Sequence, residues 1–227
     1  MVAVATEAEM SRAPLAEAGA VLDLDKFSVT PLMQDPYQYM VVADFVRPAA
    51  LAAVAADFPQ IDKPGSFPLA TLTYGPAFAG LISELEGETF RRQVEKKFGL
   101  DLAGRPTMVT VRGQTDATDG RIHTDSRSKI ITMLIYFNEE WQNQGGKLRV
   151  LRSATDLEDY AAEVEPRMGT LLAFRRSDHS WHGHKPYVGP RRAIQLNWVM
   201  DEGVKVREQK RHRLSAFFKK LLGGYAE

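Results

Sequence analysis

The stretch from Lys129 to Asn138 reads KIITMLIYFN, in which β-branched, aromatic and other apolar side chains outnumber polar ones. This composition is typical of a β-strand. Four further stretches of the same character follow Pro106, at residues 107–112, 147–151, 170–174 and 191–200. Short strands at this spacing, with Gly145-Gly146 marking a hairpin, predict a double-sheet barrel or jelly roll.

Helical spacing of apolar residues dominates the region before these strands. After Pro48, Leu51, Val54, Ala55 and Phe58 recur at i, i+3, i+4 and i+7, the pattern of an amphipathic helix with proline in its first turn. Two further helices are predicted over residues 78–85 and 90–98, the second ended by Gly99. A strand at 37–45 precedes them. The fold class expected is therefore α+β, mainly β, with N-terminal helices packed on one sheet.

Composition narrows the function classes. The chain has 227 residues, 29 basic and 29 acidic, and no cysteine. This length fits one domain, and the balanced charge gives no reason to expect nucleic acid as a partner. Any metal must be held by His, Asp or Glu, since thiolate ligands are excluded. No basic region followed by an apolar core stands at the N-terminus, so a cytoplasmic location is expected.

The two ends differ from the middle. Residues 1–20 are rich in Ala and Glu and are expected to be a flexible extension, followed by the domain at 21–203 with its core at 105–200. Residues 204–227 are predicted to form a basic amphipathic C-terminal helix. Its apolar face would pack on the domain or make a peripheral membrane or partner contact. That face is Leu214, Phe217, Phe218, Leu221 and Leu222.

Histidines and one aspartate form the most informative chemical pattern. His123 and Asp125 are separated by one residue, so on a strand both would point to the same face. A third ligand could come from the later segment Ser180-Trp-His182-Gly-His184, with Arg191 nine residues after His182. Two histidines and a carboxylate make the facial triad that holds non-haem Fe(II) and leaves positions open for a co-substrate and oxygen.

The region from about Thr107 to Met200 resembles the Fe(II)/2-oxoglutarate-dependent dioxygenases, in particular their prolyl 4-hydroxylase-like branch. Five segments carry the resemblance, in the order in which the family has them. These are Gly120-Arg-Ile-His-Thr-Asp125, Lys129-Ile-Ile-Thr-Met-Leu-Ile-Tyr-Phe-Asn138, Gly145-Gly-Lys-Leu148, Glu165-Pro-Arg-Met-Gly-Thr-Leu-Leu-Ala-Phe174 and Ser180-Trp-His182 with Pro186 and Gly189-Pro-Arg191. The resemblance implies a double-stranded β-helix (jelly-roll) core and a hydroxylase that uses Fe(II), 2-oxoglutarate and dioxygen.

Carried over residue by residue, the resemblance implies that His123, Asp125 and His182 bind the metal. His182 is preferred because it follows Ser180 by two residues and precedes Pro186 by four. His184 remains a rival on the same strand face. His179 is the weaker candidate and could support a ligand instead.

Two adjacent arginines compete for the distal carboxylate of 2-oxoglutarate. Arg191 fits the Gly-x-Arg pattern, whereas Arg192 fits the spacing to Trp198. On a strand, Arg191 would share a polar face with Gln195 and Asn197, and Arg192 an apolar one, which favours Arg191. The resemblance adds Tyr136 as a donor to the same carboxylate, and Thr132 as a further cofactor-binding position. An ordinary core tyrosine also explains Tyr136.

Other charges and the substrate are less defined. Positive side chains at 112, 121, 127 and 129 surround the first ligand segment, and solvated charges are favoured over an anion-binding role. The substrate expected is a small molecule, a glycan or a protein side chain. The alternatives are a non-catalytic, cupin-like metal-binding jelly roll and a nucleic-acid demethylase of the same superfamily. Asp125 argues against halogenation, because family halogenases free that coordination position for chloride.

Overall fold

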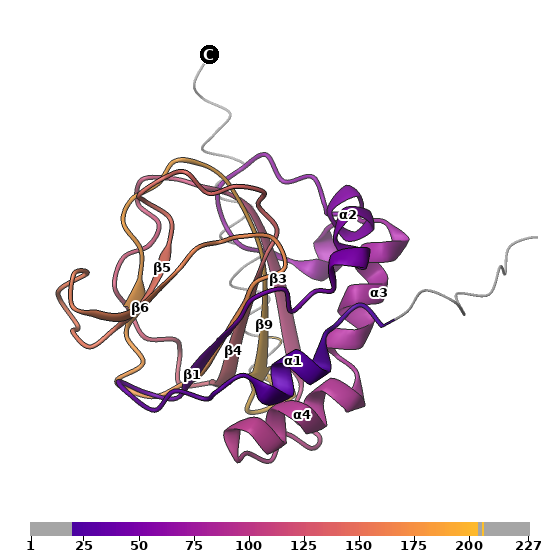
Figure 1. Ribbon diagram of the computed structural model, residues 1–227, viewed down its shortest axis with the longest axis horizontal. Coiled ribbons are helices and arrows are strands. Elements are labelled where there is room, and N and C mark those ends of the chain that lie inside the picture. Colours follow the sequence, from indigo (N-terminus) through magenta and orange to yellow (C-terminus); the bar gives the residue numbers. More distant parts are fainter. Residues whose placement is uncertain (1–19, 204–205, 207–227) are drawn as a thin grey trace, which may run out of the picture.

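The computed structural model describes residues 20–203 and residue 206 (Figure 1). Their strands form two antiparallel sheets, a six-stranded one in the order β1-β7-β4-β9-β3-β2 and a three-stranded one in the order β6-β5-β8. The strands are β1 (Tyr39–Val42), β2 (Phe67–Pro68), β3 (Thr107–Thr115), β4 (Lys129–Tyr136), β5 (Leu148–Leu151), β6 (Tyr160–Val164), β7 (Leu171–Arg175), β8 (His182–Gly183) and β9 (Gly189–Val199). This is the jelly-roll architecture predicted above.

Helices cover one side of the six-stranded sheet, and the three-stranded sheet lies on its other side (Figure 1). The helices are α1 (Leu24–Val29), α2 (Pro48–Ala56), η2 (Leu69–Thr71), α3 (Pro76–Leu85) and α4 (Glu88–Phe98). Prolines at the first positions of α2 and α3 fit the sites where a helix needs no backbone donor. Gly99 ends α4 in a left-handed conformation with φ of 63°, as the sequence predicts.

Alternation along β4 separates two cores. Ile131, Met133 and Ile135 are fully buried against the helices, in one continuous apolar cluster with Phe90 and Trp198. Thr132, Leu134 and Tyr136 point to the opposite face, between the two sheets. The inner face is therefore the one that carries polar groups, and the functional site lies there.

Several details differ from the sequence-based expectations. Helix α1 and strands β6 and β8 were not predicted, since each has six residues or fewer and too little periodicity to stand out. The short elements β2 and η2 were not predicted either. The proposed extension at 1–20, except its last residue, and nearly all of the proposed basic helix at 204–227 lie outside the described residues.

Within residues 20–203, no helix has the length and apolar character needed to cross a membrane.

Candidate metal centre

A cavity of about 470 Å³ opens between the two sheets. Its floor is the inner face of β3, β4 and β9, and its opposite wall includes the segment around His123 and strand β8. The lining includes all three predicted metal ligands together with Lys129, Thr132, His184, Arg191 and Asn197. The topology therefore gathers residues that are distant in the chain, from Ser66 to Asn197, around one space.

Two predicted ligands are tied together by the backbone. His123 and His182 form an isolated antiparallel bridge, in which the N–H of each residue donates to the carbonyl of the other at 3.0 Å. Their rings lie 4.3 Å apart between centroids. Candidate ligand atoms of His123, Asp125 and His182 all lie within 4.8 Å of one another. The predicted triad is thus assembled in space.

One local expectation was wrong. His123 and Asp125 do not lie on a continuous strand, because residues 121–126 contain only the single bridge at His123. Strand alternation therefore does not orient the pair. A loop held by the His182 bridge and by Arg176, whose Nε donates to the Asp125 carbonyl at 3.2 Å, brings the two side chains together instead.

Both imidazoles are oriented through Nδ1. In His123 this nitrogen lies 2.9 Å from the carbonyl oxygen of Arg121, and in His182 it lies 2.9 Å from that of Ser180. A carbonyl can only accept, so Nδ1 carries the proton in each ring. Nε2 is left as the unprotonated nitrogen, which is the form that binds a metal ion.

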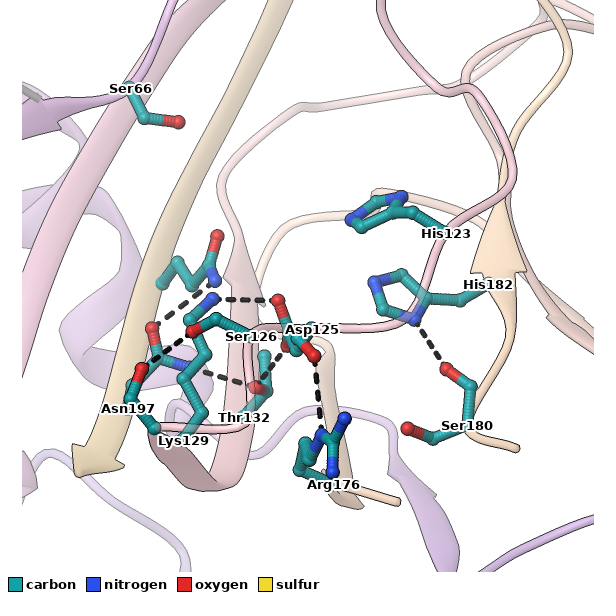
Figure 2. A network of polar contacts seen from close by, with 12 residues as sticks. Ser66, His123, Asp125, Ser126, Lys129, Thr132, Arg176, Ser180, His182 and Asn197 are labelled. Atoms are coloured by element: carbon teal, nitrogen blue, oxygen red, sulfur yellow. Dashed lines mark hydrogen bonds and ion pairs between the residues drawn. The ribbon is translucent and has the colours of Figure 1, made fainter. Parts of the chain in front are cut away.

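The Asp125 carboxylate is held by donors on both oxygens (Figure 2). Lys129 Nζ donates to Oδ1 at 2.7 Å, and the Thr132 hydroxyl makes a short hydrogen bond to Oδ2. Thr132 in turn accepts from Asn197 Nδ2 at 2.8 Å, and Gln195 donates to Asn197 Oδ1 at 3.2 Å. This chain of hydrogen bonds fixes the carboxylate from the floor of the cavity.

The protonation states suit metal binding. Burial alone would raise the pKa of Asp125, but the charge of Lys129 and the hydrogen bonds from Lys129 and Thr132 lower it to about 2. Burial lowers the pKa of His182 to about 4, against the opposing influence of Asp125. At neutral pH the site therefore presents an ionised carboxylate and a neutral imidazole, the forms in which these side chains are ligands.

Arg191 lies at another part of the cavity, where its residue is 5% exposed. Its Nε donates to the Gly146 carbonyl at 2.7 Å, while Nη2 is buried without a hydrogen-bond partner among the described residues. The guanidinium carbon lies 5.3 Å from the ring centroid of Tyr136, whose buried hydroxyl also has no partner among those residues. Two unsatisfied donors beside each other are unusual in a folded protein and fit an anionic ligand.

Arg192 points the other way. Its side chain is exposed and lies over the Phe58 ring at 5.8 Å, outside the lining of the metal cavity. The alternation along β9 thus places Arg191 on the cavity side and Arg192 on the helix side, as the sequence predicted. Thr132 also lines the cavity, but its hydroxyl proton is engaged by Asp125, and its contact with a co-substrate stays a prediction.

The rival histidines lie apart from the triad. His184 is buried in the cavity wall, where Nδ1 contacts the Lys185 carbonyl at 2.8 Å, but it is not part of the ligand cluster found among the described residues. Burial lowers its pKa to about 4. His179 is exposed and belongs to neither the cluster nor the cavity lining.

Lys129 lies closer to the candidate site than its sequence position predicts. It was grouped with solvated charges, yet its side chain is 10% exposed and contacts the predicted ligand Asp125. Arg112 is also half-buried, paired with Asp119 at 2.7 Å. Arg121 and Arg127 are exposed, as expected. The spacing of four residues between Asp125 and Lys129 could have predicted their contact. That prediction needs the intervening loop to fold back, which the sequence alone does not show.

The donor set fits Fe(II). Two imidazoles with free Nε2 atoms and one ionised carboxylate match the ligand types of the 2-His-1-carboxylate triad. The unpaired Arg191 Nη2 and Tyr136 hydroxyl fit the far carboxylate of 2-oxoglutarate. The residues present therefore suit both groups.

Comparisons with known proteins agree with this fit. Residues 111–200 match the model of the 2OG-Fe(II) oxygenase superfamily. No curated protein matches the chain.

Solved structures include three similar prolyl hydroxylases. A Phytophthora capsici prolyl 4-hydroxylase has a TM-score of 0.51 at 16% identity, over 71% of this chain and 58% of that one. A Pseudomonas putida prolyl-4-hydroxylase has a TM-score of 0.49 at 17% identity, over 78% and 93%. The collagen prolyl hydroxylase of Paramecium bursaria Chlorella virus 1 has a TM-score of 0.46 at 12% identity, over 71% and 96%. At 16% identity, the likeness to the Phytophthora capsici enzyme shows the fold alone.

The fold and the site define a jelly-roll protein with a candidate facial-triad metal centre. The matched segment contains the inner faces of β4 and β9 and all three candidate ligands. The match to the 2OG-Fe(II) oxygenase superfamily covers residues 111–200, and the fold is similar to that of the Phytophthora capsici prolyl 4-hydroxylase. That superfamily uses Fe(II), 2-oxoglutarate and dioxygen, and the candidate site has residues that fit the first two.

Proposed function

We propose that this enzyme is a 2-oxoglutarate-dependent dioxygenase that hydroxylates an unactivated C–H bond of a small molecule, glycan or protein side chain. In the overall reaction one oxygen atom enters the C–H bond and the other enters succinate, while 2-oxoglutarate loses carbon dioxide. The observation that carries the proposal is one cavity that holds the His123, Asp125 and His182 cluster together with Arg191, whose Nη2 has no hydrogen-bond partner among the described residues.

Each residue has a distinct task in this proposal. His123, Asp125 and His182 hold Fe(II), which with 2-oxoglutarate and dioxygen supplies the oxidising chemistry. Arg191 grips the distal carboxylate with its free Nη2, and the Tyr136 hydroxyl donates to the same group. The Asn197–Thr132 chain and Lys129 keep Asp125 in one orientation. The protein thereby fixes where the co-substrate lies relative to the metal.

Two other functions are less well supported. A non-catalytic, cupin-like protein would need a metal site alone, which gives no role to the buried Arg191 Nη2 that has no partner among the described residues. A nucleic-acid demethylase would need a basic surface, whereas the chain has 29 basic and 29 acidic residues.

The test is oxygen-dependent formation of succinate from 2-oxoglutarate by the Fe(II)-loaded protein. Wild type and Arg192→Met should form succinate. His182→Ala should form none, and Arg191→Met should require at least about tenfold more 2-oxoglutarate, since it loses charge-assisted hydrogen bonds. Equal succinate formation by His182→Ala and wild type would contradict the proposal.

A further inference from the structure

Lys129 is placed to bind more than Asp125. An ammonium group has three donors, and within residues 20–203 the Asp125 carboxylate is the only side chain paired with Lys129 Nζ. The Lys129 side chain is 10% exposed and lines the metal cavity. In the view of Figure 2, Asp125 stands between Lys129 on one side and the two histidines on the other. The ammonium therefore contacts a candidate metal ligand and lies in the lining of the cavity.

Strand register puts this cation at the opposite end of the cavity from Arg191. Lys129 begins β4 and Tyr136 ends it. On β9, Ala193 is opposite Tyr136, whereas Asn197 is opposite Thr132. Seven residues of strand span roughly 23 Å at about 3.3 Å each, so the two cations are anchored at separate ends. An anion held by Lys129 is thus a different group from the carboxylate held by Arg191.

The loaded cavity keeps an excess of positive charge. Its lining has the cations Arg112, Lys129 and Arg191 and the single carboxylate Asp125. Asp119, outside the lining, neutralises Arg112 at 2.7 Å. Fe(II) and 2-oxoglutarate carry equal and opposite charges, so their binding leaves one positive charge without a partner. A metal ion bound to Asp125 would also share the negative charge of this carboxylate, which weakens its electrostatic attraction to the Lys129 ammonium.

We propose that Lys129 is a substrate-binding residue, and that the substrate carries a carboxylate that pairs with its ammonium beside the metal. This inference rests on the proposed function and deepens it by naming the substrate class. The carboxylate satisfies the free Nζ donors, removes the unpaired charge and positions the neighbouring C–H bond over the metal site. Neutral compounds of the same shape lack this anchor and bind weakly.

The probe pair is benzoate and benzamide, which share a shape and differ in charge. Each is titrated anaerobically into protein carrying Fe(II) and saturating 2-oxoglutarate, and the visible metal-to-ligand charge-transfer band is recorded. The variants are Lys129→Met, Lys129→Arg as the charge-retaining replacement, and Arg127→Met as the matched control. Arg127 is two residues away, and its side chain is 85% exposed.

Benzoate should perturb the band of wild type, Lys129→Arg and Arg127→Met saturably, and benzamide should not. In Lys129→Met the band itself should remain, because the Thr132 hydroxyl still holds the Asp125 carboxylate. Benzoate should bind this variant at least about tenfold more weakly, the loss expected for a buried charge-assisted pair. Equal responses in wild type and Lys129→Met, or no response to benzoate in any protein that shows the band, would overturn the proposal. Loss of the band in Lys129→Met would also overturn it, by showing that Lys129 acts only through Asp125. Absence of the band in wild type is a different result, which contradicts the proposed function itself.

Discussion

His123 and His182 lie 59 positions apart in the chain, yet each donates its backbone N–H to the carbonyl of the other at 3.0 Å. This reciprocal pair joins the loop before β4 to strand β8. The relative position of two proposed metal ligands is thus set by main-chain hydrogen bonds, which no side-chain substitution removes directly. Changes around the site should therefore alter ligand orientation more than ligand spacing.

Thr132→Val tests how Asp125 is oriented. The substitution removes the hydroxyl that links Asn197 to Asp125 and leaves two buried polar groups without that partner. We expect a loss of about 1–3 kcal/mol in the free energy of unfolding, together with weaker Co(II) binding measured by titration of its absorption. Thr132→Ser keeps the hydroxyl and should restore most of both. If Thr132→Val binds Co(II) as tightly as wild type, the orienting role is wrong.

Gly120→Ala should be destabilising through His184. A Cβ at this position would clash with His184 Nδ1, and the backbone φ is 86°. Gly104→Ala is the matched control, since its φ is 67° but nothing lies within 4 Å of an added Cβ. Urea unfolding should show a cost of roughly 1–2 kcal/mol for Gly104→Ala and about 1–3 kcal/mol more for Gly120→Ala. Equal losses in the free energy of unfolding for the two variants would mean that the His184 ring can move away from the added Cβ.

Acid should destabilise the metal-free protein through its buried histidines. The pKa values of His182 and His184 are about 4 in the folded state and 6.5 in the reference state, so the unfolded chain binds more protons between these values. The stabilisation is complete above pH 6.5 and is lost as the pH falls toward 4, by roughly 3 kcal/mol per histidine. His184→Gln should show a shallower decline in urea unfolding between pH 7 and 4.5. An unchanged slope would contradict the burial of this imidazole.

Phe90 should be critical for the packing of helices on the sheet. Its ring lies 5.4 Å from Phe27, 5.5 Å from Phe45 and 6.1 Å from Trp198, between ring centroids. Phe90→Ala should cost about 3–5 kcal/mol in the free energy of unfolding, because it leaves a cavity among these aromatics. Val29→Ala, at a residue that is 79% exposed, should change stability by less than about 0.5 kcal/mol. A loss of less than about 1 kcal/mol in the free energy of unfolding for Phe90→Ala would mean that other residues supply the main contact between the helices and the sheet.

Periodicity predicted much of the fold and the direction of one key side chain. The alternation in β9 placed Arg191 on the cavity face because strand side chains alternate whatever the surrounding fold. The same rule failed for His123 and Asp125, where a loop and a single bridge replace the strand. Lys129 was undervalued because local sequence does not report that a charged residue at a strand end is buried against a ligand.

The most direct test is binding of Fe(II) and 2-oxoglutarate without oxygen, followed through the visible metal-to-ligand charge-transfer band. Wild type should show the band, and His182→Ala should not. Arg191→Met should need at least about tenfold more 2-oxoglutarate to give the half-maximal band. The adjacent Arg192→Met should need the same concentration as wild type. A protein that binds the metal tightly but shows no band with 2-oxoglutarate would contradict the assignment of this cavity to that co-substrate. A band that depends on Arg192 and not on Arg191 would contradict the proposed carboxylate anchor.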